Sequence, residues 1–128
     1  MGDRCAAFPR SARLLAAADY RRVFATPQRS SDRFFTCLAC PGTTAEARLG
    51  LAVARKCARR AVARNRLKRL IREVFRGYRA DLLRAGCNLD IVVLCRPPAV
   101  AADNSTLRRS LNRHLDHLRG RLCAGSSA

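Results

Sequence analysis

Apolar residues recur three and four positions apart in the middle of the chain, a spacing that predicts one long helix over Ala61–Arg79. At about 100° per residue these positions fall within one sector of the helix, which predicts a single buried face. The residues on that face are Ala63, Leu67, Leu70, Ile71, Val74, Phe75 and Tyr78. A second helical stretch, Ala80–Arg84, runs into Ala85-Gly86, a sequence typical of a helix C-terminus.

Other apolar runs predict strands. Arg33–Cys40 is apolar and rich in aromatic residues, and the turn-forming residues Pro41-Gly42-Thr43-Thr44 follow it. We therefore expect Arg48–Ala54 to be the returning strand. Leu89–Cys95 is a β-branched run of the kind that is buried on both faces, and Pro97-Pro98 ends it.

Shorter patterns predict a helix near each end of the chain. Ala16–Phe24 has helical character, and Pro27 ends it. Near the C-terminus, Asp103, Asn104 or Ser105 is positioned to cap a final amphipathic helix. Its apolar face carries Leu107, Leu111, Leu115 and Leu118.

The predicted order α-β-β-α-β-α is that of an α/β fold of the α+β two-layer type, similar to a ribosomal-protein-like fold. We expect a sheet of three or four strands, with the long helix and the C-terminal helix on one face. The short N-terminal helix would edge the other face and leave an open groove beside Tyr20 and Phe24. We expect one domain over residues 13–120, between a disordered N-terminus (residues 1–12) and a flexible tail (residues 121–128).

Charge adds a second pattern to the long helix. Between Arg55 and Arg79, eleven Lys and Arg residues accompany one acid, Glu73, and the whole chain has a net charge of +17. The positions opposite the apolar face are Asn65, Lys68, Arg69, Arg72 and Arg76, with Arg64 and Arg66 at its borders. A helix anchored by one face holds such cations in a fixed array, which favours a polyanion, above all nucleic acid, as the partner.

A membrane surface is an alternative polyanionic partner, but the apolar face contains no Trp and is more simply a core face. No segment approaches the ~18 consecutive apolar residues of a membrane span. Asp3, Arg4, Arg10 and Arg13 interrupt the N-terminal residues, unlike a signal peptide. We therefore expect a cytoplasmic protein without a membrane partner.

The seven cysteines are an odd number in a chain without an export signal, so we expect most to be small packing groups rather than a disulfide framework. Cys37 and Cys40 lie three apart in a predicted strand and should face opposite sides, which disfavours a shared metal. His114 and His117 can share a helix face, but no second pair of ligands is near them in the sequence. The nine acids are scattered singly, without the carboxylate pair of a metal-dependent nuclease. We expect no metal site on this chain.

The segment Gly50–Arg76 closely resembles the protein subunit of bacterial ribonuclease P. Its Arg64-Asn65-Arg66 triplet, followed by basic residues on a long helix, matches the signature of that family. Asp19–Phe24 resembles the family's N-terminal basic and aromatic segment, and Arg33-Phe34-Phe35 begins the first strand as in that family. The later strand and the leucine-rich last helix follow in the same order.

This resemblance implies a large catalytic RNA as partner, in a one-to-one complex that removes the 5′ leader from precursor tRNA. The metal ions, Mg²⁺, would be held mainly by the RNA, and the protein would supply no catalytic residue and bind no cofactor of its own. The residues implied to contact the catalytic RNA are Arg64, Asn65, Arg66, Lys68, Arg69 and Arg72. The residues implied to line a cleft for the single-stranded leader are Tyr20, Phe24, Arg33, Arg55 and Lys56.

Other interpretations stay open at this point. Tyr20 and Phe24, at positions i and i+4, can simply pack the short helix onto the sheet. A structural rRNA-binding protein would share the charge and the fold, but it has no use for a groove with aromatic edges. A DNA-binding basic helix of the zipper type needs a continuous helix, which Gly77, Gly86 and Pro97 exclude.

Overall fold

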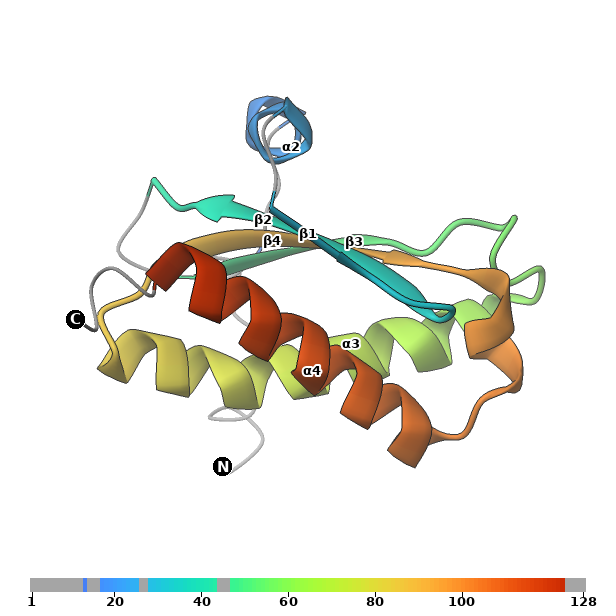
Figure 1. The fold of residues 1–128 in the computed structure, drawn as a ribbon. Coiled ribbons are helices and arrows are strands. Elements are labelled where there is room, and N and C mark those ends of the chain that lie inside the picture. Colours follow the sequence, from blue (N-terminus) through green and yellow to red (C-terminus); the bar gives the residue numbers. More distant parts are fainter. Residues whose placement is uncertain (1–12, 14–16, 26–27, 44–46, 124–128) are drawn as a thin grey trace, which may run out of the picture.

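The computed structural model describes residues 13, 17–25, 28–43 and 47–123, whose strands form one four-stranded sheet with the order β1-β2-β4-β3 (Figure 1). The strands are β1 (Gln28–Ser31), β2 (Phe35–Pro41), β3 (Arg48–Ala52) and β4 (Leu89–Cys95). The helices are α2 (Ala17–Ala25), α3 (Ala61–Arg84), the short 3-10 helix η2 (Pro97–Ala101) and α4 (Asn104–Cys123). The predicted α/β class is confirmed.

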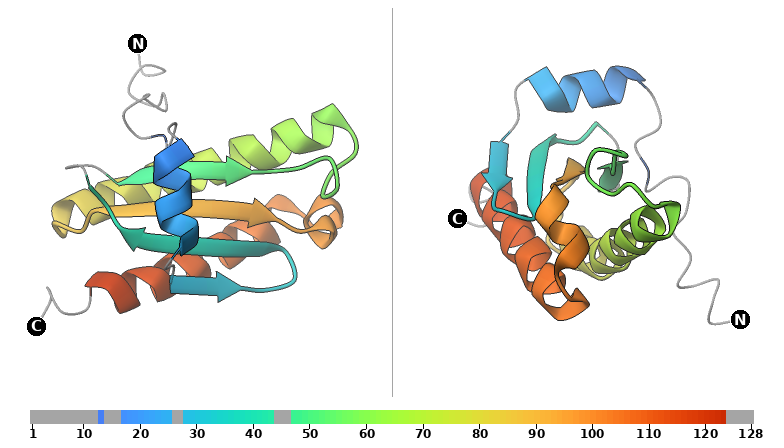
Figure 2. Two further views of the ribbon diagram at one scale, coloured as in Figure 1. Left: turned by 90° about the horizontal axis from the view of Figure 1, so that it is seen from above. Right: turned by 90° about the vertical axis from the view of Figure 1, so that its right-hand side faces the viewer.

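Helices cover the two faces of the sheet unequally. Both α3 and α4 lie on one face, whereas α2 alone lies on the opposite face (Figures 1 and 2). The left view of Figure 2 shows α2 lying across the strands rather than along them. The predicted placement of the three helices is therefore confirmed, and no helix of the described ranges covers the rest of the α2 face.

Strand β4 lies in the interior of the sheet and pairs with both β2 and β3. Its pairing with β2 is antiparallel, with Phe35 opposite Cys95, and its pairing with β3 is parallel, with Arg48 opposite Asp90. Strand β3 thus runs antiparallel to β2, as expected of a returning strand, but β4 lies between the two. Turn residues indicate a reversal of the chain but not the neighbour of each strand, and α3 supplies the crossover that a parallel pair requires.

Helix α3 is continuous from Ala61 to Arg84, so the two helical stretches expected from the sequence are one helix. Gly77 lies inside it at a cost of only about 1 kcal/mol relative to alanine. The helix ends at Gly86, whose φ of 67° is a left-handed conformation that glycine adopts readily. The predicted apolar face is confirmed: Leu67, Leu70, Ile71, Phe75 and Tyr78 are buried, and Ala63 and Val74 are partly buried against the same core. Leu82, beyond the predicted face, is buried as well.

Helix α4 is capped by Asp103, one of the three candidates, whose carboxylate accepts a hydrogen bond of 2.8 Å from the backbone N–H of Thr106. The four leucines expected on its apolar face are all buried. Residues 121–123, which the sequence placed in a flexible tail, continue this helix.

The sequence pattern did not predict β1, whose residues are polar and show no apolar alternation. This strand pairs with β2, with Ser30 opposite Cys37. The hydroxyl oxygen of Ser30 lies 2.6 Å from Nδ1 of the buried His114 on α4. Polar contacts of this kind leave no signal in a hydrophobicity pattern, which explains the missing strand.

The sheet separates a large apolar core, shared with α3 and α4, from a small cluster under α2. Cys37 belongs to the large core and Cys40 to the small cluster, so the two cysteines face opposite sides as predicted. The small cluster consists of Val23, Leu38, Cys40 and Val92, with the partly buried Tyr20 and Leu94 packed against it.

Four cysteines of the described chain lie in two disulfide pairs. Cys57, between β3 and α3, is joined to Cys95 at the end of β4, and Cys87 is joined to Cys123 at the end of α4. The Cα–Cα separations are 6.1 and 6.0 Å, within the range that a disulfide spans. The expectation of no disulfides is therefore wrong for these four, because residues 38 and 36 positions apart meet only in the fold, although all four also pack in or against the large core.

Some expectations fall on residues outside the described ranges. They are the expected disorder of residues 1–12, Ala16 as the first residue of the N-terminal helix, Pro27 as its end, Thr44 as a turn residue before β3, and residues 124–128 of the expected tail. Within the described ranges, no helix combines the length and apolar character needed to cross a membrane.

Candidate nucleic-acid interface

The outward face of α3 carries cations that have no acidic partner among the described residues. Arg69 is exposed, Lys68 and Arg72 are half-exposed, and Asn65 lies exposed beside them. Glu73 does not neutralise this group, because it pairs with Arg108 of α4 at 3.2 Å. We call Asn65, Lys68, Arg69 and Arg72 the α3 array. Because α3 is anchored in the core, the array is held at a fixed spacing.

Arg64 lies at the start of α3 and holds the connector, residues 53–60, against the helix. Its Nη1 donates hydrogen bonds to the backbone carbonyls of Ala58 and Arg59, at 3.0 and 2.9 Å. Because a helix begins at Ala61, these bonds fix the direction in which the basic connector enters it. Arg64 therefore has a structural role that its position in a charged triplet did not reveal.

Arg66 joins α3 to the start of α4. Its guanidinium donates to Oδ1 of Asn104 at 3.1 and 2.9 Å and to the carbonyl of Ala102 at 2.7 Å. A further bond of 3.2 Å reaches the carbonyl of Val100. This fork of donors satisfies backbone carbonyls around η2, so Arg66 orients the whole C-terminal segment as well as contributing charge.

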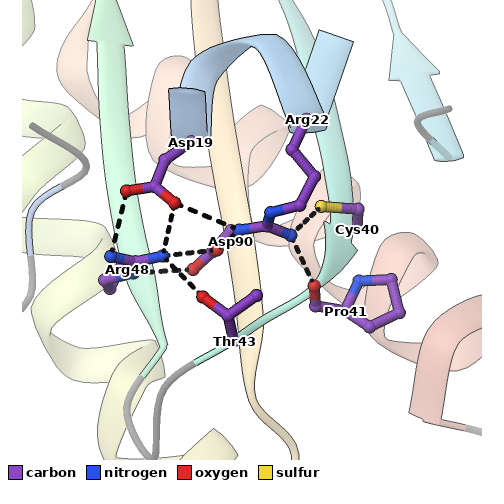
Figure 3. Close-up of polar contacts among 7 residues, drawn as sticks. All are labelled: Asp19, Arg22, Cys40, Pro41, Thr43, Arg48 and Asp90. Atoms are coloured by element: carbon purple, nitrogen blue, oxygen red, sulfur yellow. Dashed lines mark hydrogen bonds and ion pairs between the residues drawn. The ribbon is translucent and has the colours of Figure 1, made fainter. Parts of the chain in front are cut away.

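A network of charged side chains fixes α2 to the sheet (Figure 3). Asp90, on β4, is fully buried, and its carboxylate accepts hydrogen bonds from Arg48 at 3.0 and 2.8 Å. Arg22 of α2 also donates to Asp90, and it bonds the carbonyl of Pro41 at 2.8 Å. Asp19, in the first turn of α2, accepts from Arg48 at 3.2 Å. The hydrogen bonds with Asp90 raise the pKa of both arginines above their ordinary value.

Tyr20 lies over Gly50 of β3. A Cβ atom at Gly50 would lie only 2.7 Å from the ring and hydroxyl of Tyr20, so this close approach requires glycine. Tyr20 is half-buried against the small cluster, whereas Phe24, one turn later, keeps 47% of its surface exposed. Tyr20 therefore packs α2 onto the sheet while part of its side chain stays accessible, and Phe24 presents an aromatic ring to solvent.

One row of residues across the sheet is not fully covered on the α2 side. Thr36 lies opposite both Leu94 and Ser31 in the pairing register, and Leu94 lies opposite Ala52. Ser31 is exposed and the other three are half-buried. We call these four residues, Ser31, Thr36, Ala52 and Leu94, the open strip. Its side chains are small or apolar, so the surface of the sheet beside α2 carries no long side chain from these four residues.

Cations gather at the end of the sheet next to the open strip. Arg33 precedes β2, and Arg55 and Lys56 follow β3, which places all three at the C-terminal ends of β3 and β4. All three are exposed. Arg55 and Lys56 line a shallow open hollow together with Arg59. The fold therefore brings the predicted cations Arg33, Arg55 and Lys56 to one end of the sheet.

The turn that carries Arg33 is held by Asp32. The Asp32 carboxylate accepts hydrogen bonds from the backbone N–H groups of Phe34 and Phe35, at 2.8 and 3.0 Å, and from Ser110 of α4 at 2.6 Å. Nε2 of His114 lies 3.2 Å away. Burial raises the pKa of Asp32, but the hydrogen bonds from Ser110 and the backbone outweigh it and lower that pKa to about 2. The turn is thus fixed to α4 by an ionised carboxylate.

Sequence reasoning missed the residues that position these surfaces, namely Arg22, Arg48, Asp90 and Asp32. One signal was present: Asp90 is an acid inside an otherwise apolar strand, and a buried carboxylate needs partners. The sequence could not identify the partners, because Arg48 lies 42 positions away. Within the described ranges, no three His, Cys, Asp or Glu side chains gather as metal ligands.

A twisted four-stranded sheet with a long basic helix on one face and a short helix across the other defines a class of small basic α/β proteins, and solved structures share this fold. The ribonuclease P protein of Staphylococcus aureus has a TM-score of 0.73 at 29% identity, covering 82% of this chain and 93% of that one. The ribonuclease P protein of Thermotoga maritima has a TM-score of 0.67 at 30% identity, covering 84% and 94%.

Sequence comparison gives the same result over most of the chain. The family model for ribonuclease P matches residues 8–119. The ribonuclease P protein component of Thioalkalivibrio sulfidiphilus is 47% identical over 83% of this chain and 85% of its own length. That of Methylococcus capsulatus is 46% identical over 94% and 91%. The chain belongs to the family of ribonuclease P protein components.

Proposed function

We propose that this chain is the protein component of a ribonuclease P holoenzyme and promotes removal of the 5′ leader from precursor tRNA in the cytoplasm. The observation that carries the proposal is the presence of two surfaces on opposite faces of the sheet, each with exposed cations on it or at its end. One is the α3 array, and the other is the open strip with the cations at its end. Two such surfaces suit a protein that holds two RNA segments at once.

The α3 array is proposed to bind the catalytic RNA in a one-to-one complex. Arginine suits this role because its planar guanidinium can donate to two phosphate oxygens together. Arg64 and Arg66 flank the array and add their charge to it, while their hydrogen bonds hold the connector and α4 in place. A rigid frame lowers the entropy lost when long side chains are ordered on the RNA.

The open strip is proposed to receive the single-stranded leader. Phe24 offers a ring on which a base can stack, a contact worth about 1–3 kcal/mol per base in single-strand binders. The low side chains of Ala52 and Thr36 leave room for the strand, and Arg33, Arg55 and Lys56 are placed to meet its phosphates. Such contacts do not depend on base identity, so the site would accept leaders of varied sequence.

The cleavage chemistry is proposed to belong to Mg²⁺ ions held mainly by the RNA. The residues of this chain fit that division of labour, because Asp90, Asp19 and Asp32 are engaged by arginines or hydrogen-bond donors within the fold. The protein would act by binding and orienting the substrate, which by itself can contribute strongly to rate.

A reconstitution assay tests the proposal. The purified chain is added to the candidate catalytic RNA of the same organism, and cleavage of a labelled precursor tRNA is followed at low magnesium. Leader removal that requires both components supports the proposal. Absence of both binding and stimulation would contradict it and favour the structural rRNA-binding alternative, which footprinting on ribosomal RNA then tests.

A further inference from the structure

Two cysteine pairs link the opposite ends of β4 to segments that are distant in the sequence. The connector pair is Cys57 with Cys95, and the terminal pair is Cys87 with Cys123. Cys95 is the last residue of β4, whereas Cys87 precedes its first residue by two positions. The remaining described cysteines, Cys37 and Cys40, are buried and unpaired.

We propose that the connector pair is a reversible dithiol–disulfide site that reacts with low-molecular-weight disulfides such as oxidised glutathione. Closing it ties the connector, with Arg55, Lys56 and Arg59, to the end of β4 beside the open strip. The terminal pair closes by the same chemistry at the far end of β4. This inference goes beyond the proposed function, because the bond forms or fails to form whether or not RNA is bound.

The arrangement of each pair suits stepwise exchange. Cys95 is partly exposed, whereas Cys57 is only 7% exposed, so an incoming disulfide meets Cys95 first. The Cys95 thiolate attacks one sulfur of oxidised glutathione, forms a mixed disulfide and releases one glutathione thiolate. The Cys57 thiolate then attacks Cys95 Sγ and releases the second glutathione. Two protons and two electrons leave the protein, and the oxidant becomes two reduced thiols.

The surroundings favour these cysteines over the other two. The Cα atoms of Cys57 and Cys95 are 6.1 Å apart and Cys95 is partly exposed, so this pair has both a partner sulfur and a point of entry for the oxidant. By contrast, burial raises the pKa of Cys37 to about 12, so its thiol stays protonated and unreactive at neutral pH. A pair kept as thiols by reducing conditions would close only under oxidation, as cytosolic disulfides do.

Titration of the full chain with oxidised glutathione tests the proposal, in a Cys5→Ser background that removes a cysteine outside the described residues. We expect each pair to lose two hydrogens in mass, peptide mapping to show the Cys57–Cys95 link, and dithiothreitol to reverse it. We also expect oxidation to raise the thermal midpoint by roughly 10 °C. A stable glutathione adduct on Cys95 without closure, or no reaction at all, would overturn the proposal.

Amide hydrogen exchange gives a second, local measurement. The N–H groups of Cys57 and Ala58 donate to the carbonyl of Ala54 at 3.0 and 3.1 Å, so their exchange reports on the order of the connector. Oxidation should slow the exchange of these two amides severalfold in the Cys5→Ser protein. It should do the same in the matched control Cys123→Ala, which breaks only the terminal pair. Cys95→Ala should abolish the slowing. If oxidation slows amide exchange equally in Cys123→Ala and Cys95→Ala, the connector pair is not the reversible disulfide site.

Discussion

Arg48 holds Asp90 with two parallel hydrogen bonds, Nε to Oδ1 at 3.0 Å and Nη2 to Oδ2 at 2.8 Å, and so ties an edge strand to an interior strand. Asp90 is completely buried, and Arg48 is 12% exposed. The same carboxylate receives Arg22 from α2, so one buried acid sets the position of the helix that borders the open strip.

Removing Asp90 should therefore damage the fold strongly. Asp90→Ala leaves Arg48 and Arg22 with only the partly exposed Asp19 as a counter-charge, and we expect a loss of about 3–5 kcal/mol in the free energy of unfolding. Urea denaturation followed by circular dichroism measures it. The matched control is Asp81→Ala, which breaks an exposed pair with Arg84 and should cost less than about 1 kcal/mol. Equal losses for the two variants would show that the network does not anchor α2.

Gly50→Ala should disturb the contact between β3 and α2. The new methyl group would lie within 2.7 Å of Tyr20, so the ring and the helix must move, and we expect a loss of about 1–3 kcal/mol in unfolding free energy. Gly77→Ala is the control, because nothing lies within 4 Å of the added Cβ on α3 and the change should stabilise by about 0.5–1 kcal/mol. Replacing Tyr20 by Ala in the Gly50→Ala background should remove the clash; no recovery would place the damage elsewhere.

A comparison of Arg66→Ala with Arg69→Ala should distinguish a structural role from an electrostatic role of the arginines on α3. Arg66→Ala removes charged hydrogen bonds to the start of α4, and we expect a loss of about 1–3 kcal/mol in stability. Arg69→Ala should leave stability within about 0.5 kcal/mol, because this side chain is exposed and has no partner in the described part of the chain.

The salt dependence of binding to the catalytic RNA completes this comparison. Arg69→Ala should reduce the slope of log affinity against log salt by about one, as expected for one lost phosphate contact. An unchanged slope and affinity would remove Arg69 from the interface. Thermal melts of both variants check that the binding data refer to folded protein.

The lowered pKa of Asp32 predicts that the protein loses stability in acid. Its folded pKa of about 2 lies below the ordinary value of 3.8, so the folded state favours the carboxylate. The stabilisation is fully present above pH 3.8 and is lost as the pH falls through 3.8 toward about 2. Unfolding free energy measured across this range should fall less steeply in Asp32→Asn. Ser110→Ala should show an intermediate slope, because the Ser110 hydroxyl is the strongest of the donors that lower this pKa.

Phe24 tests the proposed leader site. Because this ring is half exposed, Phe24→Ala should change stability little while weakening the holoenzyme's binding of precursor tRNA about fivefold or more. Binding of mature tRNA, which lacks a leader, should be unaffected. Equal weakening for the two RNAs would argue that Phe24 acts through packing. Val62→Ala serves as a control, since it removes an even more exposed apolar side chain, 76% against 47% for Phe24, on the other side of the sheet.

The sequence predicted the features that depend on local pattern. The apolar face of α3, the buried strand β4 and the leucines of α4 all follow from periodicity, because a regular helix or strand places residues at fixed spacing on one face. The stop at Gly86 follows from the chemistry of a single residue, whereas the cap of α4 was predicted only to within three residues, of which the structure selects Asp103. The exposed α3 array is the complement of the apolar face and was predicted with it.

Features that depend on distant partners could not be predicted in this way. The sequence places Arg48 and Asp90 on separate strands but does not say that these strands are neighbours. The roles of Arg64 and Arg66 as donors to backbone carbonyls were hidden because a cation near other cations suggests an RNA contact. The cysteine pairs were missed for the same reason, since only the fold brings their members together.

The position of β4 also determines when this sheet can form during synthesis. Strands β2 and β3 are synthesised early, but they do not pair with each other. Both pair with β4, which is synthesised only after the whole of α3. Until Cys95 has left the exit tunnel, only the hairpin of β1 and β2 can assemble. The most basic stretch of the nascent chain is therefore complete before it has a sheet to pack against, in the immediate vicinity of ribosomal RNA.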